Sequence, residues 1–256
     1  EWRDQCEELS QHQPAEDLPT GRFNMIVPQS HCTAFGQKIR SWQNITILSY
    51  LFLGGRCANC KKSISSRYKL VELLTGLLVA ICAFHFGAVW ESVMAIVLTF
   101  ALVPITLIDA KTQLIPDSIV FPLLWIGLAM SLFHPLNGSD TLFIAPKDAI
   151  VGAIAGYLSL WSVYQLFKLV TGKEGMGYGD FKLLAALGAW LGWQQLPMII
   201  LMSALVGAIV GLSLMAFRNH DRSVPIPFGP YLAAAGWITM LWGETIKQTY
   251  LDLLIQ

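Results

Sequence analysis

Charged side chains are scarce in this sequence of 256 residues. Asp, Glu, Lys and Arg make up 13% of it, whereas a soluble domain of this length carries about a quarter. Hydrophobic residues make up 54%, and the mean hydropathy is +0.53. An ordinary water-soluble domain is therefore excluded, because much of the surface does not need water. The formal net charge is zero, so no basic excess points to a nucleic-acid partner.

The sequence also lacks an initiator methionine, a signal-peptide pattern and a convincing internal repeat. It begins at Glu1, and we expect the natural N-terminus to precede this residue. Residues 1–67 are polar and rich in charge, and they contain turn signals such as Gly54-Gly55. We therefore predict two parts, a small extramembrane domain at 1–67 and a transmembrane helical bundle at 68–256.

Long apolar stretches begin at about Tyr68. Most approach the ~20 residues that cross a hydrocarbon core of ~30 Å, and small residues recur at spacings suited to close helix packing. The predicted fold is an all-α polytopic membrane protein with seven spans in this chain. The stretches are 68–90, 92–108, 118–134, 149–170, 181–193, 197–216 and 227–243.

Positive charge sets the predicted orientation. When residues 1–67 are placed in the cytoplasm and the spans alternate, 15 of the 17 Lys and Arg residues fall on the cytoplasmic side. Only Lys147 and Lys247 lie outside. The opposite orientation would violate the positive-inside rule.

Two acidic residues, Asp109 and Asp180, fall on that cytoplasmic side. Asp109 ends the second span, and Asp180 precedes a short apolar run that covers only ~20 Å at ~1.5 Å per residue. Two carboxyl groups brought together at low dielectric do not both ionise, so such a pair shares one proton and suits peptide hydrolysis. The alternative for each residue alone is a helix cap or an ion pair with Lys111 or Lys182.

Two further acids compete for a role. Asp117 follows Pro116 and precedes an apolar run, a pattern typical of a helix N-cap, and it is the rival of Asp109 for the first catalytic position. Glu72 lies about one turn into its span. We interpret it as a structural acid that snorkels or faces the bundle, with a supporting role in the site as the alternative.

Five blocks of sequence together resemble the type IV prepilin peptidases, which are aspartic peptidases of the GxGD type. Here the GxGD pattern is Gly177, Gly179 and Asp180, followed by Lys182, and it would be weak evidence without the other blocks. The resemblance implies that Asp109 and Asp180 are the catalytic pair and that Gly177, Gly179 and Lys182 support it. The blocks are residues 50–61, 67–73, 108–117, 172–182 and 225–230.

The resemblance also implies substrates, a cofactor and a location. Family members cleave the basic leader of type IV prepilins and type II secretion pseudopilins after a glycine. Many then N-methylate the new N-terminal residue with S-adenosylmethionine. They lie in the bacterial inner membrane with the active site facing the cytoplasm. No glycine-rich loop of the Rossmann type follows a strand here, so no residue is assigned to the methyl donor.

The sequence departs from the family pattern at two points. Members commonly begin with one more span, which implies an eight-span protein whose first span precedes Glu1. Many members also carry two CxxC pairs, but here the first pair ends at Phe35. A zinc-ribbon-like Zn²⁺ site would use Cys32, Cys57 and Cys60.

A structural zinc ion takes four ligands, so this site needs a further residue, either His31 or Cys6. The alternative is a loop held by packing, with free thiols in a reducing compartment. The fifth cysteine, Cys82, lies in an apolar run and is predicted to be a small core residue.

Two other functions fit part of the pattern. A proton-coupled transporter would also retain acids within the membrane, but we find no inverted repeat, and the acids gather on one side. A relative that binds pilins without cutting them would not need both aspartates.

Overall fold

The computed structural model describes residues 66–133, 144–172, 175–218 and 227–255. The chain divides into two compact units, Glu1–Leu73 and Leu74–Gln256. Of the first unit, the described residues include only the start of the first helix. The second unit contains the rest of that helix and all the helices that follow, and the site described below lies within it.

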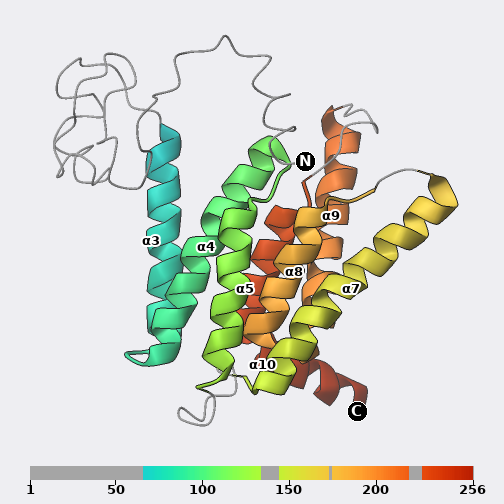
Figure 1. The fold of residues 1–256 in the computed structure, drawn as a ribbon. Helices are drawn as coiled ribbons and strands as arrows, with labels where there is room; N and C mark the ends of the chain where they lie inside the picture. Colours follow the sequence, from blue (N-terminus) through green and yellow to red (C-terminus); the bar gives the residue numbers. More distant parts are fainter. Residues whose placement is uncertain (1–65, 134–143, 173–174, 219–226, 256) are drawn as a thin grey trace, which may run out of the picture. The chain divides into compact units, whose positions relative to one another are not determined.

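Every apolar stretch predicted from the sequence forms a helix (Figure 1), so the described residues confirm an all-α polytopic membrane protein. A single turn of 3₁₀ helix, Trp193–Gln195, precedes α9. The helices are α3 (Ser66–Phe86), α4 (Trp90–Thr112), α5 (Asp117–Ser131), α7 (Pro146–Thr171), α8 (Tyr178–Leu191), α9 (Leu196–Arg218) and α10 (Gly229–Ile255).

Four segments within the described residues are long and apolar enough to cross a membrane. They are Lys69–Phe86, Trp90–Thr112, Pro146–Thr171 and Trp193–Ser213. A helix satisfies its own backbone hydrogen bonds, which is why such segments are stable in hydrocarbon. Many large apolar side chains on α7 and α9, such as Leu169 and Leu201, are exposed, as expected for surfaces that face lipid.

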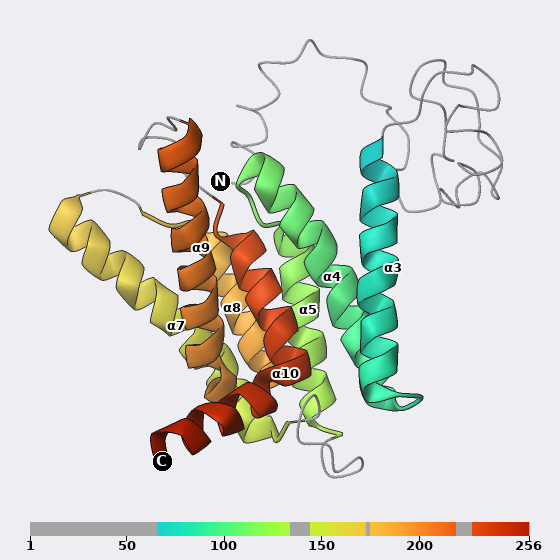
Figure 2. The same ribbon diagram turned by 180° about the vertical axis from the view of Figure 1, so that it is seen from behind.

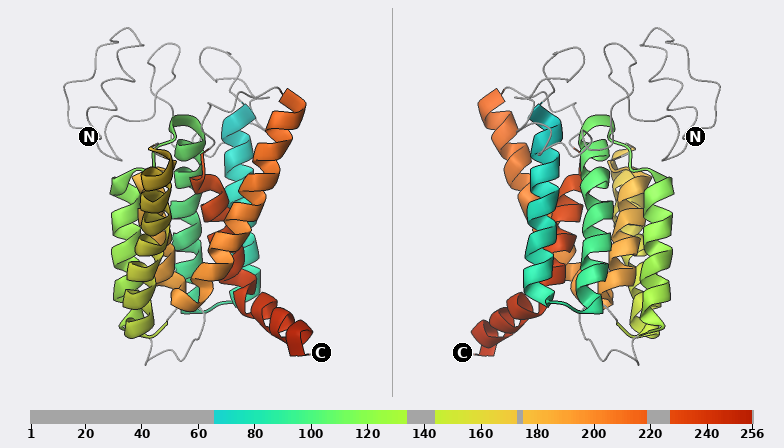
Figure 3. Two further views of the ribbon diagram at one scale, coloured as in Figure 1. Left: turned by 90° about the vertical axis from the view of Figure 1, so that its right-hand side faces the viewer. Right: turned by 90° about the vertical axis from the view of Figure 1, so that its left-hand side faces the viewer.

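Helix α8 is the most buried helix of the Leu74–Gln256 unit. Each of its residues from Asp180 to Leu191 is buried except Lys182. It packs mainly against α7 and α5 and also contacts α10. In Figure 1, α5 and α8 lie between α4 and α7, and Figure 2, seen from behind, shows α9 and α10 in front of this group; Figure 3 gives the two side views.

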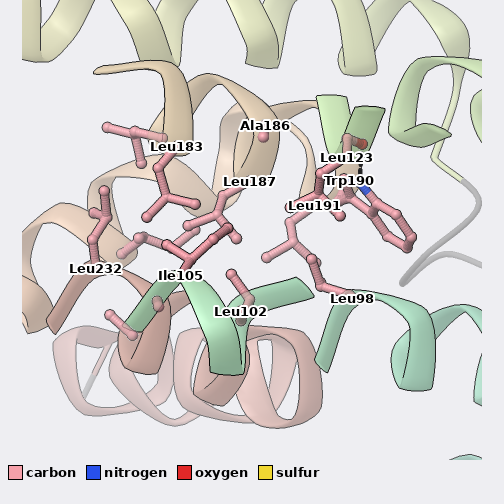
Figure 4. Close-up of a cluster of buried hydrophobic side chains, with 14 of the residues drawn as sticks. Leu98, Leu102, Ile105, Leu123, Leu183, Ala186, Leu187, Trp190, Leu191 and Leu232 are labelled. Atoms are coloured by element: carbon pink, nitrogen blue, oxygen red, sulfur yellow. Dashed lines mark hydrogen bonds between the residues drawn. The ribbon is translucent and has the colours of Figure 1, made fainter. Parts of the chain in front are cut away.

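The core forms where side chains of α8 meet those of α4, α5 and α10. Figure 4 shows this cluster, with the indole N–H of Trp190 donating to the carbonyl oxygen of Leu123 at 2.7 Å. This hydrogen bond satisfies a polar group that burial would otherwise leave without water. The other labelled members are Leu98, Leu102, Ile105, Leu183, Ala186, Leu187, Leu191 and Leu232.

Close contact between α7 and α8 depends on glycine. A β-carbon added to Gly188 would collide with the carbonyl oxygen of Gly152, and one added to Gly152 would collide with that of Gly188. Gly156 likewise faces the backbone at Leu184. These contacts confirm the close packing predicted for Gly152 and Gly156, in which small residues let two backbones approach.

The turn after α4 positions Asp109 and the start of α5. Helix α4 ends at Gln113, which has a left-handed φ of 56° and whose N–H donates to the Asp109 carbonyl at 2.8 Å. A short connection then leads to Pro116, the N-cap residue of α5. The end of α4 and the starts of α5, α8 and α10 consequently lie at the same end of this unit (Figure 1).

Replacing Gly188 with Ala should destabilise the protein, because the new methyl group meets backbone that cannot rotate away. Overpacking of this kind costs about 1–3 kcal/mol. The thermal unfolding temperature in detergent should therefore fall by about 2–4 °C per kcal/mol. Gly76→Ala on α3 is the matched control, since nothing lies within 4 Å of the added carbon. Equal unfolding temperatures for the two variants would contradict the packing described here.

Candidate active site

Asp109 lies in the last turn of α4 and is buried, with 4% of its surface exposed. Its carboxyl group faces the start of α10, where the backbone amide of Gly229 interacts with it. A β-carbon added to Gly229 would lie 2.6 Å from Asp109 Oδ2. Only glycine therefore permits the start of α10 to approach this carboxyl group so closely.

Asp180 is the third residue of α8 and is 7% exposed. Gly177 is the N-cap residue, and its backbone amide interacts with the Asp180 carboxyl group. This arrangement matches half of a capping box, in which the third helical residue reaches back to the N-cap N–H. The positive end of the helix dipole also favours an acid at this position. No side-chain hydrogen bond caps α8, so the helix-cap alternative for Asp180 stays a prediction.

The Ile115 side chain packs between the start of α8, which carries Asp180, and the start of α10, which faces Asp109. Added β-carbons on Gly179 and Gly229 would lie 2.8 Å from Ile115 Cβ and 2.9 Å from Ile115 Cδ1, respectively. The buried Ile115 side chain therefore touches both the residue before Asp180 and the residue that faces Asp109. The two carboxyl groups are close enough to interact electrostatically. The structure thus brings the predicted pair together at one end of the bundle.

Each aspartate has one buried oxygen that finds no hydrogen-bond partner among the described residues. These atoms are Asp109 Oδ2 and Asp180 Oδ1. An unsatisfied buried polar atom costs about 1–3 kcal/mol, and such atoms mark places where a ligand, water or proton belongs. Two adjacent carboxyl groups with free oxygens can hold a water molecule and move its protons, which is the chemistry of a general acid and base.

Lys182 does not pair with Asp180, which was one alternative from the sequence. Its ammonium group donates to both carboxylate oxygens of Asp117, at 2.8 and 2.9 Å. The ammonium also lies 5.4 Å from the centroid of the Phe121 ring. This ion pair links α8 to the start of α5.

The prediction that Asp117 caps its helix is wrong. Pro116 is the N-cap residue of α5, and no side-chain hydrogen bond caps the helix. Asp117 is the first helical residue, and its side chain is 43% exposed. Both of its oxygens are occupied by Lys182. Asp117 therefore resembles neither a cap nor the buried, unpaired carboxyl groups of Asp109 and Asp180.

Other predicted residues lie in several places. Cys82 is a buried free thiol near Thr99 Oγ1, as expected for a core residue. Glu72 lies near the start of α3 and is half-buried. Its Oε2 atom has no partner among the described residues, and both of its predicted roles stay predictions.

The predicted zinc ligands lie outside the described residues. They are Cys32, Cys57 and Cys60, with His31 or Cys6 as the fourth. Within the part of the chain that the structure describes, no group of three or more His, Cys, Asp or Glu residues could hold a metal ion.

Sequence reasoning did not assign a role to Ile115 or Gly229. Both lie in blocks that carry the family resemblance, yet nothing local distinguishes them from other apolar or turn residues. The one signal was the position of Gly229 beside Pro230 at the start of an apolar run, since proline favours the first turn of a helix.

The fold and the site together define a polytopic membrane protein with two buried carboxyl groups between helix ends. The profile of the type IV leader peptidase family matches residues 96–212, and that of the bacterial peptidase A24 N-terminal domain matches residues 12–86. The chain belongs to the type IV leader peptidase family.

Curated relatives agree. Over 251 residues the chain is 52% identical to the prepilin leader peptidase/N-methyltransferase of Pseudomonas aeruginosa, covering 98% of this chain and 83% of that protein. It is 53% identical over 243 residues to the protein of the same name from Aeromonas salmonicida, covering 95% of this chain and 80% of that protein. The protein of that name from Dichelobacter nodosus is 47% identical over 234 residues, covering 91% and 78%, respectively. No solved structure matches the chain.

Proposed function

We propose that this protein is a membrane-embedded aspartic endopeptidase that removes the leader of prepilins, with Asp109 and Asp180 as its catalytic pair. The observation that carries the proposal is the burial of these two acids side by side, each with an oxygen that no described residue binds. The names of the relatives, prepilin leader peptidase/N-methyltransferase, indicate the substrate and a second activity, N-methylation of the cleaved product.

The reaction needs one charged and one neutral carboxyl group. The charged one takes a proton from a water molecule as the water oxygen attacks the scissile carbonyl carbon. The neutral one donates its proton to the carbonyl oxygen. When the tetrahedral intermediate collapses, the carbon–nitrogen bond breaks, and the leaving nitrogen takes the proton that the first carboxylate removed from water. The second carboxylate regains a proton from a hydroxyl group of the intermediate, so the pair returns to one charged and one neutral group. Both aspartates act on the same water and carbonyl, so their close approach is required.

The orientation of the membrane spans fits such a substrate. In the orientation predicted from the sequence, most Lys and Arg residues fall on the same side of the membrane as Asp109 and Asp180, and the positive-inside rule assigns that side to the cytoplasm. We place the protein in the bacterial inner membrane on this basis. A substrate with a basic leader and an apolar helix would present the junction between them at this level. Type II secretion pseudopilins share this design, and we propose cleavage after glycine in both groups.

The methyl donor of the second activity would be S-adenosylmethionine. The described residues contain helices and turns but no strand, so they offer no glycine-rich turn between a strand and a helix for a nucleotide. We assign no residue to the donor and derive no step of the reaction through it.

Membership in a peptidase family disfavours both alternative functions. A transporter would place its acids near the membrane midplane, whereas Asp109 and Asp180 lie at helix ends at one end of the bundle. A relative that only binds pilins would have no need of two buried carboxyl groups with free oxygens, which are costly to retain.

Asp109→Asn and Asp180→Asn should each fold and bind a prepilin but cleave it about 10²–10⁴-fold more slowly, because a positioned acid or base contributes about that factor. Purified protein would be mixed with a prepilin, and cleavage followed by mass spectrometry. Asp148→Asn is the control, because Asp148 contacts Trp193 rather than the site. If Asp109→Asn cleaved at nearly the wild-type rate while Asp117→Asn did not, the assignment of the first aspartate would be wrong.

Gly229→Ala should lower kcat by about 100-fold, since small displacements of reacting groups have effects of that order. The added carbon would lie 2.6 Å from Asp109 Oδ2 and 2.9 Å from Ile115 Cδ1, so one of them must move. Gly207→Ala is the matched control, because its nearest neighbour is a Tyr231 side-chain atom at 3.4 Å. A normal kcat for Gly229→Ala would show that the approach of α10 to Asp109 does not matter for the reaction.

Labelled S-adenosylmethionine added to the same reaction should transfer label to the pilin only when cleavage occurs. Cleavage creates the amino group that accepts the methyl group, so Asp180→Asn should leave the intact prepilin unlabelled. The label would be followed by gel autoradiography of the pilin. Label on uncut prepilin would contradict the proposed order of the two activities, and absence of label from the wild-type product would remove the methyltransferase activity from the proposal.

A further inference from the structure

The Lys182–Asp117 ion pair connects the two segments that carry the catalytic acids. Lys182 lies two residues after Asp180 on α8, and Asp117 lies at the start of α5, beyond the short turn that follows Asp109. Residues two apart on a helix point in directions about 200° apart. Accordingly, Asp180 interacts with Asp109, whereas Lys182 contacts Asp117 and Phe121 on α5.

We propose that Lys182 and Asp117 are positioning residues that hold Asp180 at its working position relative to Asp109. This inference rests on the proposed function of the pair. The ion pair ties the first turn of α8 to the first turn of α5, and Ile115 fills the space between α8 and α10 two residues before Asp117. A shift of α8 along its axis would have to break the ion pair and displace Ile115 together.

The Lys182–Asp117 ion pair is held by more contacts, and its lysine is less exposed, than is usual for an ion pair on a protein surface. Exposed pairs contribute little because both side chains are mobile and solvated. Here the ammonium donates to both oxygens of Asp117 and lies near the face of the Phe121 ring, and the Lys182 side chain is only 27% exposed. Helix α8 is otherwise buried over its whole length after Gly179. Lys182 is the only charged side chain of α8 after Asp180, and it is used to fix the helix against α5.

The same contacts exclude Asp117 from the chemistry itself. Both of its oxygens accept hydrogen bonds from Lys182, whereas Asp109 and Asp180 each keep one buried oxygen without a partner among the described residues. Asp117 therefore acts on the reaction through the position of α8 and not by proton transfer.

The test measures kcat and KM for prepilin cleavage by full-length Lys182→Met, Asp117→Asn, their double variant and Lys182→Arg. We expect kcat to fall about 10–100-fold in each single neutral variant, with KM changed by less than about twofold. The double variant should be no slower than the slower single variant, because the two residues act as one unit. Lys182→Arg keeps the charge and can still donate to both oxygens of Asp117, so it should recover kcat to within about threefold of wild type. Lys247→Met is the matched control, since it removes the ion pair with Glu244 farther along α10.

The other outcomes overturn the proposal. Wild-type kcat in the single variants would leave the pair a structural role only, and losses that multiply in the double variant would show that the residues act independently. A loss in Asp117→Asn as large as in Asp109→Asn, with Lys182→Met near normal, would make Asp117 a reacting acid. Should Lys182→Met fail to fold, as judged by thermal unfolding, then Asp117→Asn and Lys182→Arg decide. If wild type did not cleave prepilin at all, the proposed function itself would fail, and the positioning role with it.

Discussion

Two carboxyl groups buried at the ends of packed helices are the constraint on which the arrangement of this protein depends. Desolvating an acid is costly unless the protein supplies compensating dipoles. For Asp180 these are the N–H of Gly177 and the start of α8, and for Asp109 the facing group is the amide of Gly229. Gly229 can approach so closely because glycine has no β-carbon there, whereas a β-carbon on Gly177 would lie at an ordinary distance of 3.9 Å from Asp180 Oδ2. The glycines and the acids thus form one unit, in which the backbone replaces part of the lost water.

The rest of the bundle keeps that unit in place. Helix α8 is buried after its first turn and has α7, α5 and α10 as neighbours. Its approach to α7 at Gly152 and Gly188 leaves little freedom to rotate, because backbone meets backbone there. Rotation of α8 by even part of a turn would move Asp180 away from Asp109. The close packing far from the acids therefore contributes to the geometry at the acids.

The sequence was sufficient to predict the helices and to place Asp109 and Asp180 at the same end of the bundle, but not to predict the contacts around them. Long apolar runs identify spans almost directly, since a helix is the simplest way to satisfy a backbone in lipid. Charge asymmetry then placed Asp109 and Asp180 on one side. The cap predicted for Asp117 failed because the Pro-Asp pattern is local, whereas the partner of Asp117 is Lys182, 65 residues away. Ile115 and Gly229 were missed for the same reason, since their roles exist only once distant segments meet. The predicted zinc ligands lie outside the described residues, so that prediction stands as made.

Asp109 and Asp117 show how position decides the chemistry of identical side chains. They are separated by one short turn, and both lie at helix ends. Asp117 faces a lysine and remains partly exposed, and both of its oxygens accept hydrogen bonds from that lysine. Asp109 is buried and faces Gly229 and a second acid, Asp180. Two buried carboxyl groups of this kind fit the proton sharing that we propose for the peptidase reaction, whereas the neighbouring ion pair links α8 to α5. The lysine two residues beyond Asp180 thus pairs with Asp117 on α5, while no ion pair joins Asp109 or Asp180 to another residue in the part of the chain that the structure describes.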